Sequence, residues 1–113
     1  MYAQEISRLK SEISELQNLR HRISSASGRC ERLIARLEPI AERAHLATAG
    51  SISEQHHHMV GAATEAHRQL RSTRERLSDS AHAVLSQVHR LEAEISRLRR
   101  LQQEAERHET SRR

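Results

Sequence analysis

The chain has 113 residues, of which 35% are hydrophobic and 30% are charged, with a formal net charge of +4 and an isoelectric point near 10.5. Tryptophan and phenylalanine are absent and Tyr2 is the only tyrosine, which argues against a compact globule with an aromatic-filled core. No apolar run approaches about 18 residues and no basic-then-apolar segment opens the sequence, so we expect neither a transmembrane helix nor a Sec-type signal peptide.

Apolar residues in the first half of the chain have the spacing of a coiled-coil helix. The letters a to g denote the positions of the seven-residue repeat, in which a and d form the seam that faces a partner helix. With Ile6 as position a, the a positions are Ile6, Ile13, Arg20, Ser27, Ile34 and Ala41, and the d positions are Leu9, Leu16, Ile23, Cys30, Leu37 and Ala44. This pattern predicts a helix over about residues 2–48.

Two places weaken this first helix. Arg20 and Ser27 put polar residues on the seam, and Gly28 costs about 1 kcal/mol relative to alanine in a helix interior. Pro39 lacks an N–H group and its ring crowds the preceding turn. The seam keeps its phase across both places, which predicts kinks in one helix. A helix boundary near residue 38 is the alternative.

A turn is predicted at about residues 49–52, within LATAGSISEQ. Gly50 suits the left-handed conformation just past a helix end. Ser51 and Glu54 form a capping box, in which each side chain accepts a hydrogen bond from a free backbone N–H at a new helix start. A second helix is therefore expected over about residues 53–108.

The second half of the chain has its own seam, out of phase with the first. With Val60 as position a, the a positions are Val60, His67, Arg74, Ala81, Val88, Ile95 and Gln102, and the d positions are Ala63, Leu70, Leu77, Val84, Leu91, Leu98 and Ala105. Two seams joined by a tight turn predict an all-α fold, a long antiparallel two-helix hairpin that forms one domain over residues 1–113. In such a hairpin, residues whose numbers add to about 104 face each other.

The apolar surface is wider than a two-helix hairpin needs. Leu19, Leu33 and Ile40 fall at g positions, and Leu85 falls at an e position. A wide apolar face on two helices predicts that another helical pair packs against it and completes a four-helix bundle. The expected partner-binding residues are Ile13, Leu16, Leu19, Ile23, Leu33, Leu37, Ile40, Leu70, Leu77, Val84, Leu85, Val88, Leu91, Ile95 and Leu98.

The two ends, EISRLKSEISELQNL and LSQVHRLEAEISRLRRLQQE, together with the glycine-containing turn between them, resemble the small WXG-like (ESAT-type) helical-hairpin proteins of type VII secretion. The resemblance is greatest to the short partners of LXG toxins. The Trp-x-Gly turn and the C-terminal Tyr-x-x-x-Asp/Glu export signal of that family are both missing. The resemblance therefore implies an accessory partner, which packs against the helical N-terminal region of a secreted effector and has no enzyme activity.

Histidine, arginine and cysteine residues supply the other candidate sites. His56, His57 and His58 fan out around a helix and cannot converge on one ion without His45 or a second chain, so we expect a solvated turn and no metal. We expect His67, at a seam position, to be a tolerated polar residue; the alternative is that its charging near pH 6 weakens the bundle. Arg20 and Arg74, also at seam positions, either meet a partner's carboxylate or extend to the surface. Cys30 is expected to act as a small apolar seam residue.

These patterns indicate a non-enzymatic protein–protein interaction module without a cofactor, bound to an LXG-type effector or to a second copy of itself. A self-associating coiled-coil scaffold protein is the alternative. An arginine-rich nucleic-acid-binding protein is a third reading, which the dispersed positive charge permits without indicating it. We expect a cytoplasmic protein, or one exported with its partner by type VII secretion.

Overall fold

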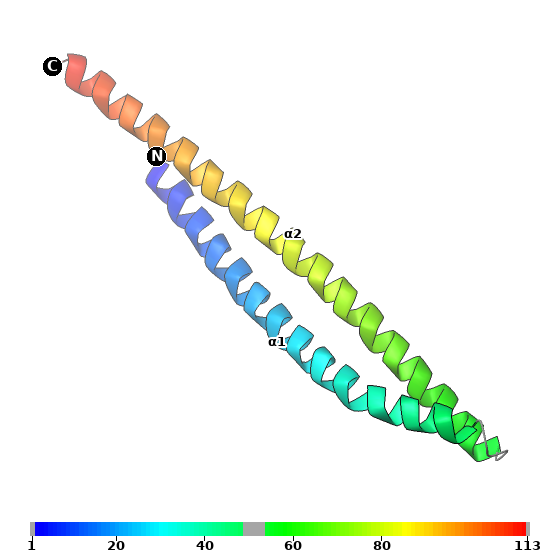
Figure 1. Ribbon diagram of the computed structural model, residues 1–113. Helices are drawn as coiled ribbons and strands as arrows, with labels where there is room; N and C mark the ends of the chain where they lie inside the picture. The colour runs from blue at the N-terminus through cyan, green and yellow to red at the C-terminus, as the bar shows by residue number, and fades with distance from the viewer. Residues whose placement is uncertain (1, 49–53, 113) are drawn as a thin grey trace. The chain divides into compact units, whose positions relative to one another are not determined.

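The computed structural model describes residues 2–48 and 54–112, and this part of the chain consists of two helices. Side chains are described in these ranges only outside residues 44–57. Helix α1 spans Tyr2–Thr48 and helix α2 spans Glu54–Arg112 (Figure 1). No strand occurs in these two ranges, which confirms the all-α fold class. The predicted turn, with Gly50 and Ser51, lies outside the described residues.

Helix α1 continues through Pro39 without interruption. The alternative of a helix boundary near residue 38 is therefore not observed. Leu37 and Ala41, on either side of the proline, are both half-buried. Their burial helps to offset the hydrogen bond that proline cannot make, about 3 kcal/mol in a helix interior.

Helix α2 ends at Arg112, beyond the predicted end near residue 108. All described residues after Gln102 are exposed. The extra residues are therefore held by helix-internal bonds and not by packing. One of these is the hydrogen bond that the Thr110 hydroxyl donates to the backbone carbonyl of Glu106, at 2.8 Å.

Ion pairs one helical turn apart line the solvent-exposed surfaces of both helices. Arg8 contacts both Glu5 and Glu12, and its hydrogen bond to Glu5 raises the pKa of the guanidinium. Arg97 donates a hydrogen bond to Glu94, which lowers the pKa of that carboxyl. Such fully exposed pairs contribute little to stability, because water and salt screen the attraction between their charges. They favour the helical state without deciding how the helices pair.

The chain divides into two compact units: unit 1 contains residues 1–22 and 81–113, and unit 2 contains residues 23–80. In unit 1, Ile6 and Leu9 of α1 form one apolar cluster with Ile95 and Leu98 of α2. The residue numbers of Ile6 and Leu98, and of Leu9 and Ile95, add to 104, the value expected for the predicted register. Four half-buried residues pack against this cluster: Tyr2, Ile13, Leu91 and Leu101. The two helix segments of unit 1 are therefore antiparallel.

In unit 2, the later part of α1 lies beside the first part of α2. The ring atom Nε2 of His67 is 3.4 Å from Oε1 of Glu38, a contact between residues 29 positions apart in the chain. Cys30 and Ile34 are the buried residues of this unit among those that the structure describes. Both units thus have the antiparallel pairing of a helical hairpin, as predicted; the four-helix bundle stays a prediction.

Candidate functional site

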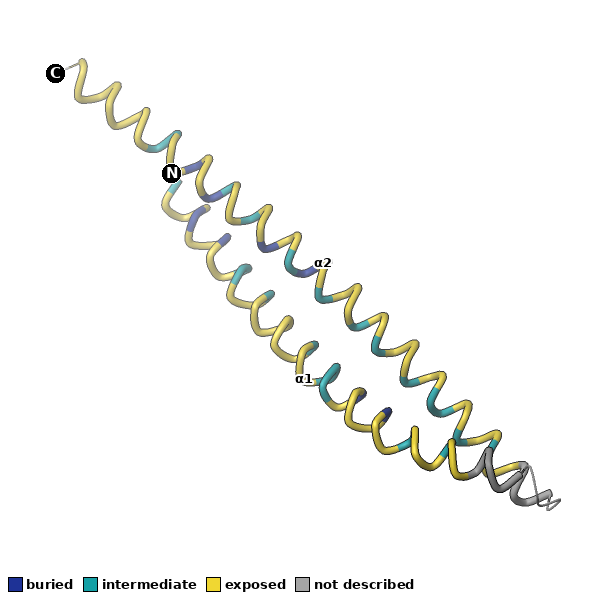
Figure 2. The backbone as a smooth tube through the Cα atoms, viewed as in Figure 1, coloured by how far each residue is buried: buried dark blue, intermediate teal, exposed yellow. Residues whose placement is uncertain are grey.

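Burial along both helices follows the predicted seams. In α2, every a and d position from Val60 to Gln102 is buried or half-buried, and the residues between them are mostly exposed (Figure 2). In α1, the same holds from Ile6 to Ala41, with the exception of Arg20. Arg20 is exposed, because its long side chain carries the charge out of the seam into water. Arg74, at the equivalent kind of position in α2, is half-buried.

The two units differ in how many hydrophobic residues they bury among those whose side chains the structure describes. In that part of the chain, unit 1 holds six buried hydrophobic residues, which are Ile6, Leu9, Val84, Val88, Ile95 and Leu98, whereas residues 23–43 and 58–80 of unit 2 hold two. The α2 seam of unit 2 carries His67 and Arg74 where a packed seam would have leucine or isoleucine, and its described residues are only half-buried. Since buried apolar area is the main source of stability, we expect these two segments of unit 2 to be less stable than unit 1.

The predicted partner-binding residues fall into three groups by exposure. Four are buried within the chain itself: Val84, Val88, Ile95 and Leu98. Eight are half-buried along the seams: Ile13, Leu16, Ile23, Leu37, Leu70, Leu77, Leu85 and Leu91. Three are exposed: Leu19, Leu33 and Ile40. The four buried residues stabilise the pairing of α1 with α2. The three exposed residues are accessible to another protein, so partner binding by Leu19, Leu33 and Ile40 stays a prediction.

Large exposed hydrophobic side chains mark the candidate interaction surface. Leu19 is 43% exposed, Leu33 45% and Ile40 54%, and all three lie at g positions of α1. Met59 of α2 is 69% exposed and was missed by the sequence reasoning. The signal that could have found it is its own g position, seven residues before Ala66.

The remaining candidate residues show no constellation for chemistry. His58 is exposed, and the side chains of His45, His56 and His57 lie outside the described ones. Among the described residues, no three histidine, cysteine, aspartate or glutamate side chains gather closely enough to hold a metal ion. Cys30 is buried as a free thiol. His67 is half-buried, and its ring lies beside the Glu38 carboxylate, so this polar seam residue has a polar partner on α1.

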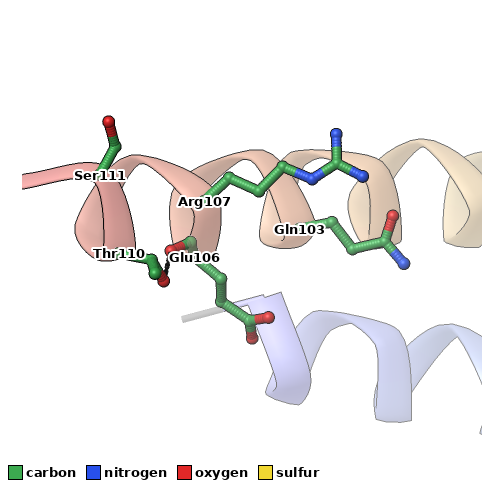
Figure 3. Close-up of a pocket in the computed structure, with 5 residues that line it drawn as sticks. All are labelled: Gln103, Glu106, Arg107, Thr110 and Ser111. Atoms are coloured by element: carbon green, nitrogen blue, oxygen red, sulfur yellow. Dashed lines mark hydrogen bonds between the residues drawn. The ribbon is translucent and has the colours of Figure 1, made fainter.

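The concave surfaces of the described chain are shallow. One lies on α2 alone, between Gln103, Arg107 and Ser111, along the exposed side of a single helix (Figure 3). Its other lining residues, Glu106 and Thr110, are one helical turn apart and bonded to each other. A surface of this kind encloses no ligand, because ligand sites bury most of what they bind.

Comparison with protein-family models, with curated proteins and with solved structures gives no significant match. Neither helix, over the residues described, is long and apolar enough to cross a membrane.

Proposed function

We propose that this chain is a non-enzymatic interaction module that packs against another helical protein. The observation that carries the proposal is the exposure of large hydrophobic side chains in each unit, Leu33 and Ile40 in unit 2 and Leu19 in unit 1. Seams with apolar flanks are typical of helices that are covered by further helices in a bundle.

The resemblance to WXG-like proteins gives the proposal its most concrete form. In that form, the chain is a small accessory partner in type VII secretion, and its partner is the helical N-terminal region of a secreted effector. The support for this form is the two-helix plan with its leucine and isoleucine spacing.

Solution mass distinguishes this function from a self-associating scaffold. The mass of the purified chain is measured by light scattering over a concentration series, with circular dichroism on the same samples. We expect a monomer, or a weak oligomer that dissociates on dilution, with less helix than α1 and α2 together contain. A fully helical dimer or tetramer that persists on dilution would contradict the proposal and favour the scaffold.

A further inference from the structure

Unit 2 has one apolar flank that the chain itself leaves open. Leu33 and Ile40 of α1 and Met59 of α2 are all exposed. Leu33 and Ile40 are seven residues apart, so they lie on the same side of α1. Met59 and Ala66 have the same spacing on α2. All four residues occupy g positions, and in an antiparallel pair the g positions of the two helices lie along the same side of the seam.

The side of α1 opposite the apolar flank is polar, and its Glu38 contacts His67 of α2. Glu38 occupies an e position of α1, and it reaches across to α2 on its own side of the seam. Ile40 follows Glu38 by two residues, which is about 200° around the helix axis. Glu31, one heptad before Glu38, is also exposed. On α1, one flank of unit 2 therefore carries the carboxylates of Glu31 and Glu38, and the opposite flank is apolar.

Arginines border the apolar flank. Arg29, Arg36 and Arg43 are seven residues apart and all exposed. Arg29 and Arg36 come four residues before Leu33 and Ile40, respectively, and residues four apart are neighbours on a helix surface. No acidic residue lies three or four positions from any of the three arginines in the sequence. The ion pairs found among the described residues do not include them either.

We infer that this arginine-edged flank, which consists of Leu33, Ile40 and Met59 with Arg29, Arg36 and Arg43, docks an acidic amphipathic helix of another protein. The inference rests on the proposed function and names the chemistry of the partner. The bound helix places leucine or isoleucine side chains against the apolar row. Its glutamates or aspartates, at seven-residue spacing, then meet the three guanidinium groups, which bind carboxylates well because they donate several hydrogen bonds from a planar fork.

The positive charge of the flank argues against a second copy of this chain as the bound partner. The same flank of another copy would bring three more arginines and no carboxylate, and like charges at an interface disfavour association. The opposite flank of α1 offers Glu31 and Glu38, but its remaining e positions in this unit are Ser24 and His45, so it has no large hydrophobic residue to cover the apolar row.

The narrowness of the apolar row argues against a lipid membrane as the bound partner. The apolar row on α1 is one residue wide, because the neighbouring seam positions turn inward: Ile34 is buried and Leu37 is half-buried. Helices that lie in a membrane interface embed a broad apolar face. A narrow apolar row with charged neighbours fits the ridge of one further helix.

The test uses the full chain and a fluorescently labelled peptide of about four heptads, with leucine at a and d and glutamate at e and g. A matched peptide carries lysine in place of every glutamate. Anisotropy titrations are expected to show that the acidic peptide binds at least about tenfold more tightly than the basic one, with an affinity that falls as salt is raised. Equal affinity for the two peptides would overturn the inference.

Variants locate the binding. Replacing Arg29, Arg36 and Arg43 with glutamine is expected to weaken the acidic peptide about tenfold, since three partly exposed ion pairs are lost. The control variant replaces Arg71, Arg99 and Arg100 with glutamine. These three arginines are also exposed but lie off the flank, and their replacement is expected to change the affinity less than twofold. An equal loss in both triple variants would mean that net charge alone attracts the peptide, which overturns the inference.

Two further variants test the apolar side chains of the flank. Leu33→Ser and Ile40→Ser change side chains that are already exposed, so the helices are expected to remain folded while the acidic peptide binds at least about fivefold more weakly. Unchanged binding would overturn the inference, and so would binding of the chain to anionic phospholipid vesicles that depends on these two residues. Tight binding of both peptides would leave the proposed function standing, whereas a stable homo-oligomer in the mass measurement would contradict that function itself.

Discussion

Truncation of Leu98 measures how much the seam of unit 1 contributes to stability. Leu98 is 5% exposed and belongs to the cluster with Ile6, Leu9 and Ile95. Leu19 offers a matched control in the same unit, because it is also a leucine of a helix but is 43% exposed. Leu98→Ala and Leu19→Ala therefore make the same chemical change at a buried and at an exposed position.

The expected magnitudes follow from burial. Full burial of a leucine side chain is worth about 1.5–3 kcal/mol, and a cavity adds to the loss. A two-helix seam is open at its sides and can close around the missing atoms, so we expect Leu98→Ala to lower the free energy of unfolding by about 2–3 kcal/mol. Leu19→Ala removes less buried area and gains a few tenths of a kcal/mol in helix propensity, which leaves a loss of about 1 kcal/mol or less.

Thermal melts followed by circular dichroism at the helix band provide the assay. At about 4–5 °C for each kcal/mol in a chain of this length, Leu98→Ala lowers Tm by roughly 10 °C and Leu19→Ala by less than about 5 °C. Urea titrations at a fixed protein concentration check the same ranking. Equal losses for the two variants would refute the assignment of Leu98 to the packed seam and of Leu19 to the free flank.

Three further predictions follow from the described residues. A methyl group added at Gly61 meets no atom within 4 Å, and one added at Gly28 meets only Arg32 at 3.8 Å, so Gly61→Ala and Gly28→Ala should each raise the free energy of unfolding by up to about 1 kcal/mol in urea titrations. Leu77→Glu and Leu91→Glu place a charge on the half-buried seam and should reduce both helix content and association, measured by circular dichroism and light scattering; unchanged values would contradict the seam. Removal of residues 103–113, which are exposed where described, should lower the helix signal by about ten residues' worth and leave Tm unchanged, whereas a large fall in Tm would show that this segment packs.

Periodicity was enough to predict the helices and their pairing. Ile6 and Leu9 repeat with the same spacing as Ile95 and Leu98, and a repeat of seven residues is a property of the chain that needs no knowledge of its partner. The exposure of Leu33 could be predicted for the same reason, because a g position lies at the edge of a two-helix seam. The continuation of α1 through Pro39 could also be predicted, because the seam keeps its phase across the proline, although the local cost of proline in a helix left a boundary near residue 38 as the alternative.

Details that depend on side-chain reach were harder to predict. Arg20 falls on the seam by its spacing, yet its flexible side chain lets the charge stay in water. The contact between His67 and Glu38 requires the register between two distant segments, which the sequence predicts only to within a residue or so. Met59 was not predicted as a contact residue, because its g position becomes informative only when it is compared with the apolar g positions of α1.

Amide hydrogen exchange of the isolated chain tests the central claim most directly, namely that the chain is incomplete on its own and that unit 2 is the incomplete part. We expect amides near Leu9, Val88 and Ile95 in unit 1 to exchange at least about tenfold more slowly than amides of the helical segments 26–43 and 60–77 in unit 2. The acidic peptide should then slow exchange in unit 2. Equal and strong protection of both units in a monomer without any partner would contradict the account.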